Sequence, residues 1–380
     1  MRIVFAACHI GQVKALKPVI DLLVERGNYV ALYLDKKQPA MRAWDSGQLK
    51  DFRSEIQLLQ VTEDGTGLCE NSTEDLGMIA RADRVLVTLS PTQTHANLER
   101  LFMKEAILKR IPVYGYSEVP CGHLAPIWSE SLHEFHRLFV AQKTPDLESR
   151  TDVIEVGCDT PLINPVRALQ TKSRLGISEA QSFVWYSGGP YHQAGVILQQ
   201  LVTIVAQMNC TAHNIQVVFS RHSRDNQDPK SYAAYEVAVK IAKREKVVIS
   251  ENSLDHPLAT TNVQRTDLVP YSLLLEACTR GGVIVTGHGT DGMAKAPRIG
   301  VPSILCVGDD LNPDLRSEKG CEYLPLPQYC PYQITDLKDL PLVLNPALYK
   351  RDAYLATCAE NYSLQPRSPA QIIVEHLTAQ

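Results

Sequence analysis

The chain has 380 residues, of which 44% are hydrophobic and 21% charged, and its formal net charge is −4. This length permits two domains with separate cores, and the charge argues against nucleic acid as the main partner, because proteins that bind nucleic acid carry a basic excess. No apolar run approaches the roughly 20 residues of a transmembrane helix. The N-terminus, MRIVFAAC, enters a strand without the layout of a signal peptide. The ten cysteines are scattered and form no CxxC pair, so we expect a cytoplasmic, reduced protein without a structural zinc site.

The first part of the chain alternates the patterns of buried strands and amphipathic helices. Strands are predicted over residues 2–7, 29–34, 56–61, 83–89, 111–116, 135–141 and 153–156, and helices over 13–26 and 96–109. This order predicts right-handed βαβ crossovers and a doubly wound parallel sheet. We assign it to an N-terminal domain of residues 1–165.

A connecting stretch is predicted from Gly157 to about Ala180, and a second α/β unit follows it. Its strands are predicted over residues 183–186, 215–219, 247–250, 283–285 and 303–307, and its helices over 195–208, 232–244, 293–299, 347–361 and 369–378, with one more short helix after Val269. We assign residues 166–345 to a second Rossmann-like domain. Residues 346–380 are expected to form helices that cross back to the first domain.

Glycine-rich turns follow two of the predicted strands of the second domain. One is Ser187-Gly188-Gly189, and the other runs from Gly287 to Gly292. The second turn contains Gly287, His288, Gly289, Thr290, Asp291 and Gly292. Glycine lets backbone N–H groups approach an anion closely, and a following helix would direct its positive end at that anion. The pair predicts a phosphate site; the alternative is two tight turns without a ligand.

Charged or titratable side chains follow three other predicted strands. Arg221 and His222 come after 215–219, where a guanidinium could pair with a phosphate, although the segment also has the character of an exposed polar turn. Glu118 follows 111–116, where partial burial would raise its pKa enough for acid or base catalysis; the alternative is a cap or a surface acid. His9 follows the first strand and is a second candidate base, or else a structural loop histidine.

With these elements in order, the chain resembles the GT-B superfamily, which contains nucleotide-sugar glycosyltransferases and UDP-N-acetylglucosamine 2-epimerases. The resemblance is carried by Gly11-Gln12-Val13 with Arg26-Gly27, by IPVYGYSEVP ending near Glu118, by GCDTPLI from Gly157, and by VVFSRHS from Val217. It is carried most clearly by Ala296-Pro297, Gly300 and Pro302, which are similar to the A-P-x-x-G-x-P of the epimerases.

Three positions depart from the family pattern. Gln12 stands where many inverting transferases have a catalytic His, and glutamine cannot act as a general base. Ser90 stands near the turn where the epimerases have an Asp. Lys295, with Ala294, stands where an acid usually holds the donor ribose.

The resemblance implies a GT-B fold: two Rossmann-like doubly wound parallel-sheet domains that face a central cleft. It implies a glycosyltransferase that moves a sugar from a nucleotide-diphospho-sugar, with a UDP-sugar as first choice, to an acceptor hydroxyl, by an inverting reaction without metal or other cofactor. His9 or Glu118 would be the catalytic base. The donor would be held by Ser187, Gly188, Gly189, Arg221, His222, Gly287, His288, Gly289, Thr290, Asp291 and Gly292.

Two other functions stay open from the sequence. An epimerase or hydrolase of UDP-sugars is supported by the A-P-x-x-G-x-P stretch and by Glu118, and a binding or scaffold protein without catalysis is supported by the three departures. The acceptor could be a sugar, a lipid-linked molecule or another small molecule. Basic residues along 98–110 could contact the inner face of a membrane, although they also suit the solvent side of an ordinary helix. A homodimer is a further option.

Overall fold

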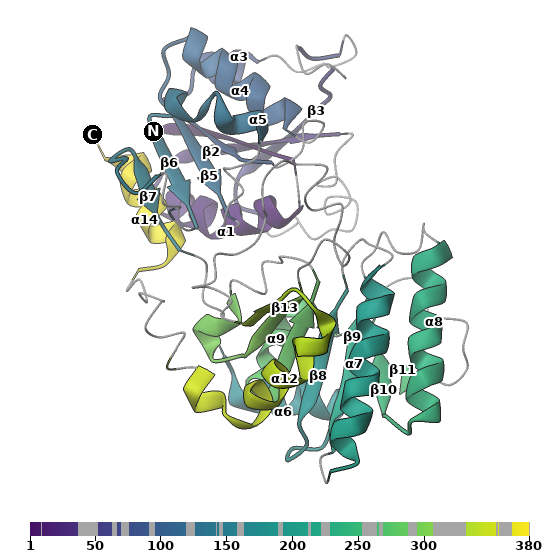
Figure 1. Ribbon diagram of the computed structural model, residues 1–380. Coiled ribbons are helices and arrows are strands. Elements are labelled where there is room, and N and C mark those ends of the chain that lie inside the picture. Colours follow the sequence, from purple (N-terminus) through teal and green to yellow (C-terminus); the bar gives the residue numbers. More distant parts are fainter. Residues whose placement is uncertain are drawn as a thin grey trace. The chain divides into compact units, whose positions relative to one another are not determined.

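The structure, a computed structural model, divides into two compact units (Figure 1). Among the described residues, the first unit comprises 1–157 and 367–379, and the second comprises 163–356. The structure describes residues 1–8, 10–36, 52–62, 67–69, 76–90, 96–118, 126–141, 143, 147–157, 163–188, 193–211, 214–221, 229–252, 264–265, 269–287, 295–306, 332–354, 356 and 367–379.

Seven parallel strands form the sheet of the first unit. They are β1 (Arg2–Ala7), β2 (Tyr29–Asp35), β3 (Glu55–Leu59), β4 (Arg84–Thr88), β5 (Val113–Ser117), β6 (Arg137–Val140) and β7 (Val153–Glu155). Their order in the sheet is β3-β2-β1-β4-β5-β6-β7. The chain builds outward from β1 to β3 and then returns to place β4 on the other side of β1, which confirms the predicted doubly wound sheet.

Helices cover both faces of this first sheet. They are α1 (Ile10–Glu25), α3 (Gly77–Ala80), α4 (Asn97–Leu108), α5 (Pro126–Ser129), the short 3₁₀ helix η2 (Leu132–Glu134) and α14 (Pro369–Thr378). Side chains of α1 and α14 pack with one set of strand residues, including Ile3 and Phe5. Side chains of α3, α4 and α5 pack with the alternate set, including Val4 and Ala6. Burial on both faces explains why the strands are continuously apolar.

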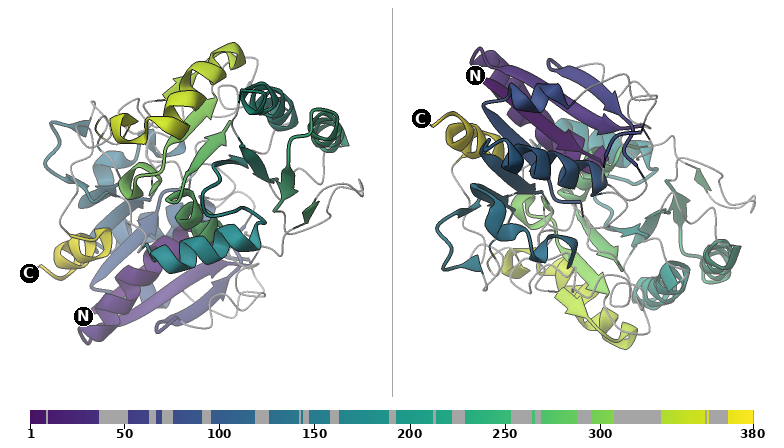
Figure 2. Two further views of the ribbon diagram at one scale, coloured as in Figure 1. Left: turned by 90° about the horizontal axis from the view of Figure 1, so that it is seen from below. Right: turned by 90° about the horizontal axis from the view of Figure 1, so that it is seen from above.

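Helix α14 lies beside α1 although most of the chain separates the two (Figures 1 and 2). It begins with a capping box: the Ser368 side chain accepts from the backbone N–H of Gln371, and the Gln371 side chain accepts from the backbone N–H of Ser368. Its buried residues Ile373, Val374 and Leu377 complete the core around α1.

The second unit repeats the same plan. Its strands are β8 (Phe183–Ser187), β9 (Gln216–Ser220), β10 (Ile249–Glu251), β11 (Gln264–Arg265), β12 (Gly282–Thr286), β13 (Ser303–Cys306) and β14 (Tyr332–Ile334). They form a second seven-stranded parallel sheet in the order β11-β10-β9-β8-β12-β13-β14. The expected α/β class with two doubly wound parallel sheets is therefore confirmed.

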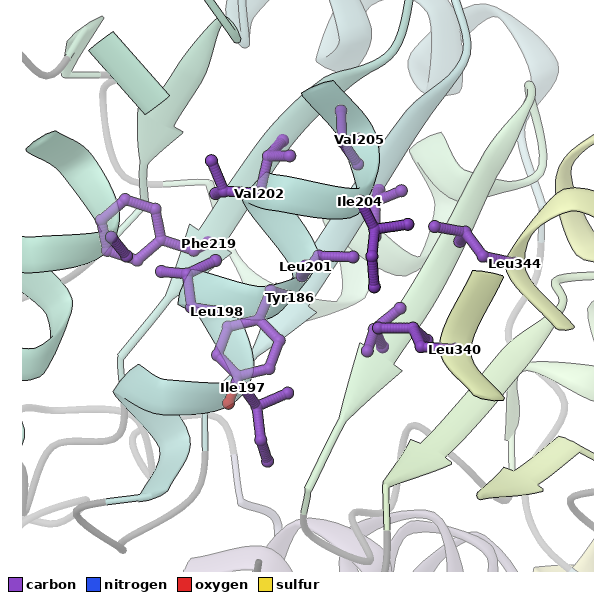
Figure 3. Packing of buried hydrophobic residues seen from close by; sticks show 14 of the residues in the cluster. Tyr186, Ile197, Leu198, Leu201, Val202, Ile204, Val205, Phe219, Leu340 and Leu344 are labelled. Atoms are coloured by element: carbon purple, nitrogen blue, oxygen red, sulfur yellow. The ribbon is translucent and has the colours of Figure 1, made fainter. Parts of the chain in front are cut away.

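Helices also cover both faces of the second sheet. They are α6 (Pro165–Arg174), α7 (Gln193–Asn209), α8 (Pro229–Arg244), α9 (Tyr271–Cys278), α12 (Leu340–Tyr349) and the 3₁₀ helices η5 (Pro297–Ile299) and η6 (Leu337–Asp339). The helices α7, α8 and α12 bury one face, and α6 and α9 lie toward the other. Figure 3 shows the first of these cores, with Ile197, Leu198, Leu201, Val202, Ile204 and Val205 of α7 near Tyr186, Phe219, Leu340 and Leu344.

Some local predictions were wrong. The stretch expected to connect the domains contains α6, which begins after Asn164, whose side chain accepts from the N–H groups of Val166 and Arg167. The helix predicted over 347–361 is confirmed in part: α12 (Leu340–Tyr349) covers its start but begins earlier, and residues 351–354 and 356 are also helical. The short outer strands β11 and β14 were not predicted.

Two cations, the buried Lys172 and the half-buried Arg351, hold the end of the second sheet where β12 begins. Lys172 of α6 is 1% exposed, and its Nζ donates to the carbonyl oxygens of Glu179, Gln181 and Arg280, each at 2.8 Å. Arg351 donates to the carbonyl oxygens of Cys278 and Gly300, at 2.8 and 2.7 Å from Nη2. Burial lowers the pKa of both side chains, and carbonyl dipoles replace the water that each cation loses.

We predict that Lys172→Met lowers the free energy of unfolding by about 3 kcal/mol, because three buried carbonyl groups lose their donor together. The measurement is urea denaturation of the full chain followed by tryptophan fluorescence. Lys240→Met, at an exposed position on α8, is the matched control and should leave the transition in place. Equal midpoints for the two variants would contradict the prediction.

Candidate functional site

The second sheet has its switch point between β8 and β12, which are neighbours although the chain builds the rest of the sheet outward from each of them. Ligands of open α/β sheets bind beyond the carboxyl ends of the strands at such a point. Ser187, the last residue of β8, pairs with Thr286, the last residue of β12. Gly188 and Gly287 therefore leave the sheet next to each other, so the two predicted glycine turns begin side by side.

Gly188 lies in a close packing position. Its backbone N–H donates to the carbonyl oxygen of Ser220 at 2.8 Å, so this N–H is already used. A Cβ atom at this residue would collide with the hydroxyl oxygen of Tyr235 and would lie 3.0 Å from the carbonyl oxygen of Ser220. Glycine is needed here for the approach of β8 to β9 and α8.

Arg221 follows β9 and is buried instead of lying in an exposed polar turn. Its side chain is 1% exposed, and its Nε donates to Oε1 of Glu251, at the end of β10, at 2.9 Å. Its guanidinium also lies 5.4 Å from the centre of the Tyr232 ring. The structure thus gives Arg221 a carboxylate partner, and its contact with a phosphate stays a prediction. Gly189, His222 and the residues from His288 to Gly292 lie outside the described residues.

The first sheet has its switch point between β1 and β4, and a buried polar cluster lies there. We call it the Glu99 cluster; its members are Cys8 after β1, Gln12 on the first turn of α1, Thr88 and Ser90 at the end of β4, and Glu99 on the first turn of α4. All five residues are at most 1% exposed.

The Glu99 carboxyl group accepts three hydrogen bonds in this cluster. Cys8 Sγ lies 3.0 Å from Oε2, and Thr88 Oγ1 and Ser90 Oγ lie 3.1 and 2.6 Å from Oε1. Ser90 is also bonded to the amide of Gln12, with Oγ 3.0 Å from Nε2. Two of the three departures from the family pattern, Gln12 and Ser90, are therefore direct partners of each other.

Burial raises the pKa of Glu99 from its usual value of 4.5 to about 7, against the opposing effect of its hydrogen bonds from Cys8, Ser90 and Thr88. Sequence reasoning missed this residue. Its signal was the spacing: Phe102, Met103 and Ala106 follow Glu99 at the interval of one helix face, and all three are buried. A carboxyl group on the apolar face of a helix is either paired or functional.

Of the predicted catalytic residues of the first unit, Glu118 lies at the same edge of the sheet. Glu118 directly follows β5, the neighbour of β4; its side chain is half-buried, and Oε2 is buried. His9 lies outside the described residues. The catalytic roles of Glu118 and His9 stay predictions.

Two further findings concern cofactors and membranes. Within the described ranges, no group of three or more His, Cys, Asp or Glu side chains is arranged to hold a metal ion. Nor does any helix in those ranges combine the length and the apolar character that crossing a membrane requires.

The chain contains two doubly wound parallel sheets in succession, and each has polar groups or glycines at its switch point. Solved structures with the same arrangement of elements match almost the whole chain. A UDP-GlcNAc 2-epimerase from Neisseria meningitidis bound to UDP-GlcNAc matches with a TM-score of 0.57 and 15% identity, over 99% of this chain and 99% of that chain. MurG from Acinetobacter baumannii matches with a TM-score of 0.57 and 12% identity, over 99% and 98%. UGT89C1 from Arabidopsis thaliana, complexed with UDP, matches with a TM-score of 0.56 and 11% identity, over 99% and 98%.

The chain therefore has the GT-B fold, and the resemblance predicted from the sequence is confirmed at the level of the fold. No protein-family model matches the sequence, and no curated protein matches it either. Because identities of 11–15% establish a fold and not a reaction, the function has to be argued from the residues.

We predict that Glu99 makes stability depend on pH. Since its pKa is about 7 in the folded protein and 4.5 is its usual value, its contribution is fully present below pH 4.5 and is lost as the pH rises through 7, by about 3 kcal/mol in total. Glu99→Gln should remove this component from the free energy of unfolding, measured by urea denaturation at a series of pH values. Glu105→Gln on the same helix leaves the buried carboxyl group in place and should keep it; identical profiles for the two variants would refute the assignment.

We predict that Gly188→Ala lowers the free energy of unfolding by about 1–3 kcal/mol, the usual cost of overpacking a core. The colliding atom is the Tyr235 hydroxyl oxygen, so Gly188→Ala combined with Tyr235→Phe should regain part of the loss relative to Tyr235→Phe alone. Thermal denaturation of the four proteins measures this coupling. Additive effects would show that Tyr235 is not the obstacle.

Proposed function

We propose that this protein is an enzyme that binds a nucleotide-diphospho-sugar, first of all a UDP-sugar, at the carboxyl edge of its second sheet and transfers the sugar to an acceptor hydroxyl. The observation that carries the proposal is the pair of glycines that leave β8 and β12 side by side at the switch point. The GT-B fold supports it, since solved structures of similar fold include proteins with UDP or UDP-GlcNAc bound.

In this proposal the second unit stabilises the leaving diphosphate. Backbone N–H groups of the glycine-rich segment after Gly287 act as donors to the phosphate oxygens. Gly188 serves a different purpose: its own N–H is bonded to Ser220, so it contributes the close approach that a side chain would block. The Arg221–Glu251 ion pair supports the ends of the neighbouring strands β9 and β10.

The first unit supplies the acceptor side. Attack by a hydroxyl group requires a base, and Gln12 cannot serve as one, because its amide does not take up a proton at neutral pH and is bonded to Ser90. Glu118 and His9 are the proposed bases. The acceptor is proposed to be a sugar, a lipid-linked molecule or another small molecule with a free hydroxyl group.

A second candidate function is epimerisation or hydrolysis of a UDP-sugar. The observation that favours it is the half-buried carboxyl group of Glu118 at the carboxyl edge of the first sheet, since proton removal from a sugar carbon also needs a carboxyl or similar group. A third candidate, binding without catalysis, is favoured by the engagement of Gln12 with Ser90.

The proposal predicts that one nucleoside diphosphate, UDP first, raises the melting temperature of the full chain, while GDP, CDP and dTDP raise it less, because a ligand of the native state stabilises it by mass action. Gly289→Trp places a large side chain in the glycine turn and should remove the shift. Lys240→Trp, exposed on α8, should keep it. No shift with any diphosphate would refute the donor site.

Turnover then separates the three candidates. A transferase releases UDP from a UDP-sugar only when an acceptor is present. An epimerase or hydrolase converts the UDP-sugar alone, and a binding protein does neither.

A further inference from the structure

In the Glu99 cluster the Ser90 hydroxyl group has two possible hydrogen-bond acceptors, one on Glu99 and one on Gln12. Ser90 Oγ lies 2.6 Å from Oε1 of Glu99, and it also lies 3.0 Å from Nε2 and 3.1 Å from Oε1 of Gln12. A serine hydroxyl has one proton. Ser90 can therefore donate to Glu99 or to Gln12, but not to both.

The protonation state of Glu99 determines which of the two acceptors receives the hydroxyl proton of Ser90. When Glu99 is ionised, its oxygens accept from Cys8, Thr88 and Ser90, and the Ser90 oxygen accepts from Nε2 of Gln12. When Oε1 of Glu99 carries a proton, it donates that proton to Ser90 Oγ, and the hydroxyl proton of Ser90 turns to Oε1 of Gln12. The contacts for both patterns are already present, so no heavy atom has to move.

A second route for the proton exists and is weaker in its geometry. A proton on Oε1 of Glu99 could instead go to Thr88 Oγ1 at 3.1 Å, whose own proton would turn to the carbonyl oxygen of Ala6 at 3.4 Å. The route through Ser90 has distances of 2.6 and 3.1 Å. Shorter contacts favour Ser90, and the position of Ser90 is held because Trp128 Nε1 donates to its carbonyl oxygen at 2.8 Å.

The surroundings of Glu99 leave its neutral and ionised forms close in free energy near pH 7. Full burial favours the neutral acid, whereas three donors and a place on the first turn of α4 favour the carboxylate. The titratable groups near it in the described part of the chain are the Cys8 thiol, which burial and Glu99 hold protonated, and Asp35 at the end of β2, which acts on Cys8. These neighbours bring no positive charge that would fix Glu99 in its ionised form.

We propose that Glu99 is a positioning residue of the first unit: acting through Ser90, its carboxyl group sets whether the side-chain oxygen of Gln12 accepts a hydrogen bond from the Ser90 hydroxyl group. Gln12 Oε1 also lies 3.4 Å from the backbone nitrogen of Cys8. In the ionised state this oxygen accepts from the backbone N–H of Cys8, and in the neutral state it also accepts from Ser90. Glu99 thereby changes the strength of the hydrogen bond from the Cys8 backbone to Gln12, at the point where the chain leaves β1. Under the proposed function, the segment after β1 faces the acceptor.

The test is the side-chain amide of Gln12, observed by NMR in the full chain labelled with ¹⁵N-glutamine and assigned by its absence from Gln12→Met. We expect its resonances to titrate with one midpoint near pH 7 in the wild type, as the pKa of about 7 for Glu99 requires, and to stop titrating in Glu99→Gln. A wild-type resonance that is flat with pH, or an unchanged titration in Glu99→Gln, would overturn the proposal.

Two variants identify the route while leaving Glu99 in place. Ser90→Ala removes the connecting hydroxyl group and should abolish the response of Gln12. Thr88→Val removes the competing hydroxyl group at nearly constant shape and should retain it. The reverse pattern, with the response surviving Ser90→Ala and lost in Thr88→Val, would overturn the role of Ser90.

The role of Glu99 rests on the proposed function only for the nature of the ligand at the first unit. The proposed function and the role of Glu99 can therefore be refuted by separate measurements. Absence of UDP stabilisation overturns the proposed function and leaves a titrating Gln12 standing. A Gln12 amide that ignores pH overturns this inference while UDP still binds to the second unit.

Discussion

The structure depends on one constraint: each of its two sheets is parallel throughout and buried on both faces. The strands can then carry almost no polar side chains along their length, and polar groups gather where strands end. At the switch points two chain segments leave the sheet side by side without a helix between them. The glycines after β8 and β12 and the cluster between β1 and β4 occupy these two equivalent positions in the two units.

Buried charge is treated differently at the two ends of the sheets. Where β12 begins, Lys172 and Arg351 meet backbone carbonyl groups, so each charge is compensated by dipoles and its role is structural. Where β9 and β10 end, Arg221 meets a full carboxylate. Where β1 and β4 end, the partners of Glu99 among the described residues are neutral donors. Of these three arrangements the last permits a change of charge near neutral pH, because a cation or a rigid set of dipoles would hold the group in one state.

The general fold could be predicted because its signals are local and repeated: apolar strands, helical spacing and glycine at the turns. The bounds of α14 agree with the prediction because Ser368 and Pro369 mark its start. Helix α6 was missed because its buried residues include Thr171 and Lys172, which suggest a solvent-facing segment until their partners are known. The Arg221–Glu251 pair depends on β9 lying next to β10, and the Glu99 cluster depends on β1 lying next to β4. The spacing of residues along the chain does not show which strands lie next to each other in a sheet, so neither contact could be predicted from it.

The position of α14 has a consequence for how the protein is made. A ribosome completes residues 163–356 before it reaches residues 367–379, yet the latter belong to the first unit. During synthesis the face of the first sheet beside α1 therefore lacks part of its cover, with Ile373 and Val374 still to come, while the second unit already has all of its sequence. The N-terminal unit is thus the one that has to wait, a reversal of the usual order in which domains fold as they emerge.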